Sequence, residues 1–265
     1  MYQFNYHRPS SLDEVKKILG DNAEAKLLAG GMTLLPTMKM RLAQPSDLVD
    51  MSGVDGLSEI RDDGDAIEIG AMVRHADVAS NDRVRASIPA LAELAESIGD
   101  AQVRNRGTIG GSVANSDPAA DYPAAVLGLN AVIKTDRREI KADDFFKGLF
   151  ETALEPGEII VAVRFPKAKR AAYAKFPNPA SRYAVVGVMV AETADGIRVA
   201  VTGAGGCAFR ASAMEAALAK DFSAAALEGI AVDAADLNSD LHASAEYRAH
   251  LVGVMAKRAV QSLGG

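Results

Sequence analysis

The first 55 residues alternate between short apolar runs and segments whose apolar residues have helical spacing. The first helical segment opens with Ser11 and Glu14, which match a capping box. Strands that alternate with helices along a chain favour parallel pairing. We therefore expect a small β-α-β-α-β unit in residues 1–55. The strands identified in it are 25–29 and 47–52, and the helices are 10–19 and 33–42.

From residue 57 onward, apolar positions alternate with polar ones, which is typical of antiparallel hairpins. The first such run turns at Asp63-Gly64, a strong hairpin signal, and the last turns at Asp195-Gly196. Helices follow the last hairpin, and this order favours an α+β arrangement at the C-terminal end. The predicted hairpins are 57–72, 131–142 and 183–206, the single strand is 158–166, and the helices are 88–99, 121–130, 212–220, 223–231 and 244–263.

The basic, proline-bearing stretch 167–180 indicates a domain boundary with one strand inside it. A chain of 265 residues has room for two modest domains. The predicted fold class is α+β, with a first domain over residues 1–167 and a smaller α+β domain over 168–265. The first domain divides into subdomains of about 1–55 and 56–167.

Composition narrows the class of protein. Hydrophobic residues make up 49% and charged residues 24%, as in ordinary globular proteins, and the net charge of -6 argues against a nucleic-acid partner. No apolar run reaches the ~18–20 residues that a membrane-spanning helix needs. The first residues lack the basic start and apolar stretch of a signal peptide, so we expect a cytoplasmic protein. One cysteine and four histidines without ligand spacing make a protein-bound metal or iron–sulfur cluster improbable.

Two glycine segments concentrate the candidate chemistry. The first, "AGGMT" at 29–33, follows a predicted strand and precedes a predicted helix. The second, "GTIGGSVANSDPAAD" at 107–121, gathers hydroxyl, amide and carboxyl side chains. Paired glycines permit positive φ and let an anion approach the backbone N–H groups. A lone glycine pair is more often a tight turn, and neither segment is a P-loop or a Rossmann fingerprint.

Four stretches in order carry a resemblance to a known family. They are "LLAGGMTLLPTMKMRLAQPSDLVDMSGVDGL", "QVRNRGTIGGSVANSDPAADYPAAVLGLNA", "ETALEPGEIIVAVRFP" and "KFPNPASRYAVVGV". The chain resembles the FAD-binding medium subunit of the molybdenum hydroxylases, which include the carbon monoxide dehydrogenase medium chain and the flavin domain of xanthine dehydrogenase. The resemblance implies a two-part FAD-binding domain of the vanillyl-alcohol oxidase-like (PCMH) type, followed by the C-terminal domain. It covers residues 1–210 well.

Carried over residue by residue, the resemblance implies that both glycine segments contact the FAD diphosphate. Asn115 and Asp121 match polar positions that bind the phosphate and the ribitol or adenosine portions. Ile160 matches an apolar position against flavin or adenine, Lys175 a lysine near the flavin ring, and Tyr183 an aromatic or apolar position near the isoalloxazine face. The diphosphate positions are Ala29, Gly30, Gly31, Met32 and Thr33 in the first segment, and Thr108, Ile109, Gly110 and Gly111 in the second. Leu34, directly after the first segment, is a further expected FAD-binding residue.

One departure from the family's pattern lies in the first segment. Many relatives have histidine and serine where this chain has Met32 and Thr33. We expect FAD binding to survive, because Thr33 keeps a hydroxyl and backbone groups do not depend on side-chain identity. If the two segments grip one diphosphate from two sides, Gly110→Asp should abolish flavin binding and leave the fold intact.

The resemblance also implies partners. A small subunit with two [2Fe–2S] clusters and a large molybdopterin subunit would join this chain in a dimer of heterotrimers. Electrons would pass from molybdenum through the clusters to FAD, and then to an external acceptor such as NAD, quinone or oxygen. No catalytic residue of its own is expected, because the flavin carries the redox chemistry. Two alternatives stay open: a non-catalytic FAD- or nucleotide-binding module, and a stand-alone flavin oxidase.

Other residues have two interpretations each. Asp117 and Asp121 form a candidate acid pair, although Asp121 before a predicted helix is equally suited to N-capping. Arg104 and Arg106 flank the second glycine segment, where a solvated arginine is the default and a phosphate or partner contact the alternative.

For Cys207, buried packing is favoured over a reactive thiol, which needs an electropositive, exposed setting. His75 opens a predicted helix and is expected to be a capping or surface residue rather than a catalyst.

Overall fold

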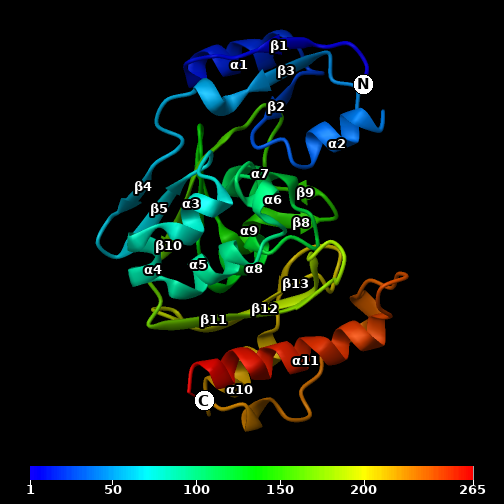
Figure 1. Ribbon diagram of the computed structural model, residues 1–265. Helices are drawn as coiled ribbons and strands as arrows, with labels where there is room; N and C mark the ends of the chain where they lie inside the picture. The colour runs from blue at the N-terminus through cyan, green and yellow to red at the C-terminus, as the bar shows by residue number, and fades with distance from the viewer. Residues whose placement is uncertain (265) are drawn as a thin grey trace.

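The computed structural model describes residues 1–264 of the chain. A three-stranded, a five-stranded and a four-stranded sheet follow one another from the N-terminal to the C-terminal end of the molecule (Figure 1). The first two sheets belong to the part of the chain before residue 167, and the third belongs to the part after it. The mixture of strands and helices, with an N-terminal and a C-terminal part, confirms the predicted α+β class.

The N-terminal unit has the predicted β-α-β-α-β order. Its strands pair in parallel in the order β1-β3-β2. Ser11 caps α1 by accepting from the N–H of Glu14, whose carboxylate accepts from the N–H of Ser10 at 2.8 Å. The apolar pattern did not identify β1, which is only three residues long. The elements are β1 Asn5–His7, α1 Leu12–Asp21, β2 Lys26–Leu28, α2 Leu34–Lys39 and β3 Asp47–Asp50.

The middle sheet is antiparallel, in the order β4-β5-β10-β6-β7, and confirms the hairpins predicted at 57–72 and 131–142. Side chains alternate between its faces, as expected for strands. On β10, Val163 and Phe165 join the central core with the helices, and Val161 packs toward the N-terminal unit. The strands are β4 Ile60–Asp62, β5 Ala66–Gly70, β6 Val132–Thr135, β7 Glu139–Lys141 and β10 Ile160–Pro166.

Short helices pack against this sheet (Figure 1). The predicted helices 88–99 and 121–130 correspond to α5 and α8, but the second glycine segment also forms a helix, α7, that the sequence did not predict. The helices are α3 His75–Ser80, α4 Asp82–Ser87, α5 Pro89–Glu96, α6 Ala101–Arg104, α7 Ile109–Asn115, α8 Tyr122–Gly128 and α9 Ala142–Phe145, and a small hairpin pairs β8 Phe146–Gly148 with β9 Glu151–Thr152.

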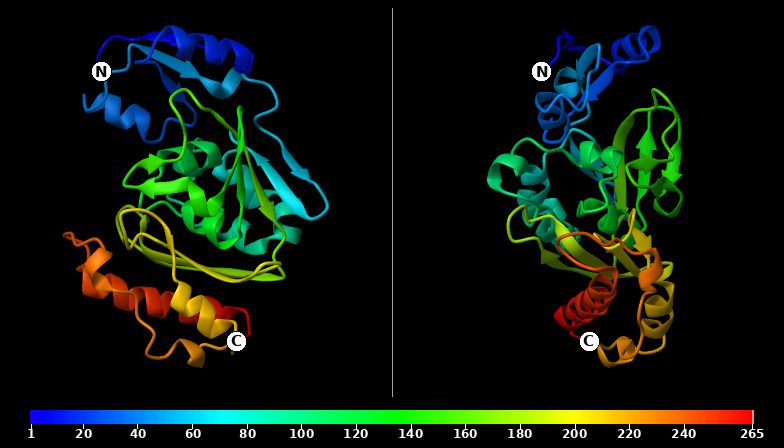
Figure 2. Two further views of the ribbon diagram at one scale, coloured as in Figure 1. Left: turned by 180° about the vertical axis from the view of Figure 1, so that it is seen from behind. Right: turned by 90° about the vertical axis from the view of Figure 1, so that its right-hand side faces the viewer.

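The C-terminal sheet is buried on both faces. On β12, Met189 and Ala191 join the central core, and Val186, Val188 and Val190 pack under the last helices. Burial on both faces explains why this strand is a continuous apolar run. The order is β11-β12-β13-β14, with α10 and α11 on the outer face (Figure 2). The elements are β11 Arg170–Pro177, β12 Ala184–Thr193, β13 Gly196–Thr202, β14 Phe209–Arg210, α10 Ser212–Leu218 and α11 Ala245–Ser262.

The helix predicted at 223–231 is wrong. Only a single 3-10 turn forms there, Ala225–Leu227, followed by Gly229 at φ +74°. Leu227 is the only buried residue of that turn. An amphipathic helix needs an apolar stripe over several turns, and one anchored side chain does not provide it.

Candidate functional site

The two glycine segments lie against each other. A Cβ on Gly30 would stand 2.1 Å from the carbonyl oxygen of Arg106 and 2.6 Å from the Cα of Gly107. A Cβ on Gly111 would approach Ala29 Cβ to 3.3 Å. Glycine is therefore required at position 30 because two backbones meet there. The prediction that these distant stretches of chain converge is supported by this contact.

The first segment leaves its backbone donors free. The backbone N–H groups of Gly30 through Leu34 donate to no acceptor within residues 1–264. Gly31 has φ +73°, which turns the chain so that successive N–H groups can converge. A row of backbone N–H groups around such a turn forms an anion-binding concavity. This segment therefore has the donors that a phosphate group requires.

The second segment uses its donors inside the protein. Thr108 caps α7 by accepting from the N–H of Gly111 at 3.2 Å, and the N–H of Gly110 donates to Ala71 O at 2.9 Å. A Cβ on Gly110 would stand 2.5 Å from that of Ala71. The absence of a side chain at Gly110 thus lets α7 pack closely on the segment that follows β5. Gly110→Asp is expected to disrupt this packing, so the expectation that it leaves the fold intact is wrong.

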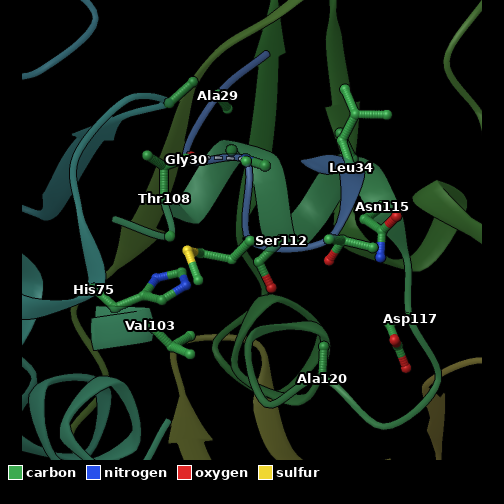
Figure 3. A pocket seen from close by; sticks show the side chains of 18 of the residues that line it. Ala29, Gly30, Leu34, His75, Val103, Thr108, Ser112, Asn115, Asp117 and Ala120 are labelled. Atoms are coloured by element: carbon green, nitrogen blue, oxygen red, sulfur yellow. Dashed lines mark hydrogen bonds between the residues drawn. The ribbon is translucent and has the colours of Figure 1, made fainter. Parts of the chain in front are cut away.

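A cavity of about 650 Å³ opens between the N-terminal unit, the middle helices and the segment before β12 (Figure 3). Ligand sites of this size are typical for cofactors. Its apolar wall includes Leu27, Met72 and Ile159, and its polar wall includes Asp117 and Tyr183. A ligand with both an apolar ring and charged groups could contact both walls.

Nearly all of the sequence-predicted site residues gather at this cavity. Ile109 is fully buried behind the wall, and Lys175 on β11 does not line it. The predicted residues that line the cavity are Ala29, Gly30, Gly31, Met32, Thr33, Leu34, Thr108, Gly110, Gly111, Asn115, Asp121, Ile160 and Tyr183.

Lys175 reaches the cavity only through Asp121. Its Nζ donates to the Asp121 carboxylate at 2.9 Å, and the Tyr173 hydroxyl donates to the same carboxylate at 2.6 Å. Both side chains of the ion pair are buried, at 8% and 4% exposed. Burial raises the pKa of Asp121, and the Lys175 ammonium opposes that rise. Asp121 makes no capping bond to α8, so the N-cap interpretation is wrong.

The turn between Asp117 and Asp121 is held by the C-terminal sheet. The Thr202 hydroxyl donates to Ala120 O at 2.6 Å, and the Gly203 N–H donates to Pro118 O at 2.7 Å. Burial raises the pKa of Asp117, and burial also raises the pKa of Tyr183. These contacts make the C-terminal part of the chain a structural component of the cavity wall.

Two family matches cover nearly all of the chain. Residues 2–168 match the family described as the FAD binding domain in molybdopterin dehydrogenase. Residues 171–263 match the CO dehydrogenase flavoprotein C-terminal domain. The chain belongs to the FAD-binding medium subunits of the molybdenum hydroxylases. It is therefore an oxidoreductase subunit, and its cofactor is FAD.

Relatives of this medium subunit match over nearly their whole length. It is 38% identical to the carbon monoxide dehydrogenase medium chain of Hydrogenophaga pseudoflava, over 98% of this chain and 96% of the relative. It is 36% identical to the nicotine 6-hydroxylase medium subunit of Paenarthrobacter nicotinovorans, again over 98% and 96%.

Solved structures agree with this family. Carbon monoxide dehydrogenase from Hydrogenophaga pseudoflava, in a form without the Mo-pyranopterin moiety, superposes with a TM-score of 0.89 at 38% identity, covering 98% of this chain and 96% of that one. Quinoline 2-oxidoreductase from Pseudomonas putida 86 superposes with a TM-score of 0.89 at 30% identity, covering 98% and 96%.

The lining of the cavity fits FAD. The free N–H groups of Gly30 through Leu34 suit a diphosphate, and the apolar wall at Leu27 and Ile159 suits an aromatic ring. Within residues 1–264, no three His, Cys, Asp or Glu side chains gather as a metal site requires, and no helix has the length and apolarity to cross a membrane.

Sequence reasoning missed some residues of the medium subunit's cavity. His75 is 5% exposed and lines the cavity, so its assignment as a capping or surface residue is wrong.

Two further residues lie outside this cavity. Arg104 is not solvated as a default arginine would be, because its guanidinium donates to the carbonyls of Ile98 and Gly99. Cys207 is only partly buried and borders a second cavity of about 480 Å³. Burial raises the pKa of its thiol, which does not favour reactivity.

Proposed function

We propose that this subunit holds FAD in the cavity between the N-terminal unit, the middle helices and the segment before β12, and that it passes electrons from iron–sulfur clusters of a partner to an external acceptor. The observation that carries the proposal is the run of free backbone N–H groups from Gly30 to Leu34 at the cavity wall. FAD supplies the electron-transfer chemistry when it is bound. The protein binds the cofactor, orients it and excludes water around it.

The diphosphate is assigned to the first glycine segment. Its N–H groups are fixed by the turn at Gly31, so they need no reorganisation when an anion arrives. The second segment supports the first, because the Gly107 backbone lies against Gly30, Gly111 leaves room for Ala29, and Thr108 holds α7 in place. This refines the two-sided grip expected from the sequence, since the donors come mainly from one side.

The remaining contacts are assigned to the walls. Ile160 belongs to the apolar wall, and Asn115, Asp121 and Tyr183 belong to the polar wall. Lys175 would act through Asp121, whose carboxylate it holds in place. The division into domains at residues 167 and 168, with a subdomain limit near 55, remains part of the proposal.

The partners follow from the family. We infer a small subunit with two [2Fe–2S] clusters and a large molybdopterin subunit, because this chain has one cysteine and cannot hold a cluster. The relatives include medium chains or subunits named for carbon monoxide dehydrogenase, nicotine 6-hydroxylase and glyceraldehyde dehydrogenase. The oxidised substrate would contact the large subunit, so residues of this chain do not select it.

The test is the visible spectrum of the tagged chain purified from its own host. Flavin absorbance together with iron–sulfur absorbance, two further polypeptides and molybdenum is the expected result. Flavin without iron or molybdenum would favour a separate flavoprotein. Absence of flavin from the complex, and no uptake of added FAD, would overturn the proposal.

A further inference from the structure

His75 is a buried titratable residue that the proposed contacts do not use. It begins α3, and its N–H donates to Gly107 O at 3.0 Å. The side chain lines the cavity, and Figure 3 shows the ring directed into it between Thr108 and Val103. Tyr122 packs on the other side of the ring, with centroids 5.3 Å apart. The ring is thus held in one orientation by its neighbours.

Both ring nitrogens lack a partner within residues 1–264. Nδ1 is fully occluded and accepts or donates no hydrogen bond. Nε2 lies 2.5 Å from the position that a Cβ on Gly107 would take. Gly107 itself contacts Gly30, where the free N–H groups begin. Because Gly107 has no side chain, Nε2 can lie against the backbone of the segment that contacts Gly30, and both border the same cavity.

The protonation state follows from burial. Burial lowers the pKa of His75 to about 4, so the ring is neutral at pH 7 and carries one proton. An occluded N–H without an acceptor is rarer and more costly than an occluded lone pair. The proton therefore belongs on Nε2, with the lone pair on the occluded Nδ1. A neutral donor aimed into the cavity suits a ligand group that only accepts.

We propose that His75 binds the diphosphate of the dinucleotide by donating a hydrogen bond from Nε2–H. Phosphate oxygens are acceptors, and this side chain would extend the row of backbone donors from Gly30 to Leu34. The inference rests on the proposed function, since it assigns a further binding residue to the same site. The Tyr122 side chain does not line the cavity, so no contact with the dinucleotide is assigned to it.

The first test compares FAD affinity of the full-length chain by titration of flavin fluorescence. His75→Phe keeps an aromatic ring but has no donor, and the dissociation constant should rise about 5- to 10-fold, the usual effect of one hydrogen bond. His75→Gln can place an amide N–H near the position of Nε2 and should recover most of the affinity. Tyr122→Phe is the matched control, which removes an unpartnered buried hydroxyl beside the same ring and should leave affinity unchanged.

The second test needs no variant. Nitrogen-15 shifts of the His75 ring in the wild-type chain should report a protonated Nε2, and that signal should move when FAD is added. A merely structural ring would not respond. Wild-type affinity in His75→Phe, or unmoved shifts while FAD binds, would overturn this inference alone. A wild-type chain that takes up no FAD, alone or in its complex, would overturn the proposed function as well.

Discussion

Gly30 packs directly against Gly107, so closely that a Cβ on the first would stand 2.6 Å from the Cα of the second. The contact joins the N-terminal unit to the segment that leads into α7. It also holds the first glycine segment, with its free N–H groups, at the wall of the cavity. The close approach of the two segments therefore depends on the absence of a side chain at Gly30.

Gly30→Ala should separate these two segments. A methyl group would meet the Arg106 carbonyl oxygen at 2.1 Å, which is backbone and cannot rotate away. We expect a loss of about 1–3 kcal/mol in the free energy of unfolding and weaker FAD binding. Urea unfolding and FAD titration measure both.

Gly20→Ala is the control for that change. Gly20 lies in α1, a methyl group there would have nothing within 4 Å, and alanine is the better helix former. This variant should be unchanged or slightly more stable. Equal FAD affinity in the Gly30 and Gly20 variants would contradict the role given to the Gly30–Gly107 contact.

Gly31→Asp should abolish or strongly weaken FAD binding. It adds a carboxylate to the turn that carries the free N–H groups, where its charge would repel the diphosphate. Its Cβ would also stand 2.9 Å from Leu35 Cδ1 and 3.0 Å from Leu28 Cδ1, which strains the turn itself. We expect the FAD dissociation constant to rise at least about tenfold. Gly64→Asp is the matched control, because Gly64 also has positive φ but lies in the β4–β5 turn, with open space around it. Similar loss of FAD in both variants would show that backbone strain, not charge, is responsible.

Lys175→Met tests the buried ion pair behind the polar wall. It leaves the Asp121 carboxylate buried without its cation, at a cost of about 3–5 kcal/mol in the free energy of unfolding. Lys169→Met, directly before the same strand β11, removes an exposed ion pair with Glu192. It should lower the free energy of unfolding by only about 0–1 kcal/mol. Urea unfolding at pH 7 compares the two. A small, equal loss in both variants would mean that Lys175 does not stabilise Asp121.

The order of elements was largely predictable from the sequence, because apolar periodicity records which faces are buried. The continuous apolar run of β12 and the turns at Asp63-Gly64 and Asp195-Gly196 are local signals. The prediction of a helix at 223–231 failed. Helix propensity alone did not form one there, because Leu227 is the only buried side chain of the 3-10 turn that the segment makes. The capping assignment of Asp121 failed because Lys175 and Tyr173, far along the chain, take its carboxylate.

The site was predictable only in part, since the convergence of the glycine segments came from a family resemblance. Composition and spacing alone did not say that the N–H of Gly30 is free while the N–H of Gly110 is bonded. The burial of His75 was not predicted, because a single histidine at a helix start has no sequence signal for burial. Its environment is made by Gly107 and Tyr122, which only the fold brings together.

Glu158 makes the stability of this subunit sensitive to acid. Its side chain is fully buried, and accepts from Arg138 at 2.9 Å and from Thr135 Oγ1 at 2.8 Å. The Arg138 guanidinium and these hydrogen bonds lower the pKa of Glu158 to about 2, from 4.5.

A carboxylate with a lowered pKa stabilises the fold fully above its unfolded pKa, and this contribution is lost as pH falls from about 4.5 to about 2. Glu158→Gln should therefore be less stable at pH 7 by about 3 kcal/mol and should lose less stability than wild type on acidification. Glu93→Gln, on an exposed position of α5, removes a carboxylate without a described hydrogen bond and should keep the wild-type profile. Unfolding free energies of the chain, measured by urea from pH 7 to pH 3, give all three profiles. If wild type and Glu158→Gln lose stability in parallel over this range, the buried carboxylate does not carry the acid sensitivity.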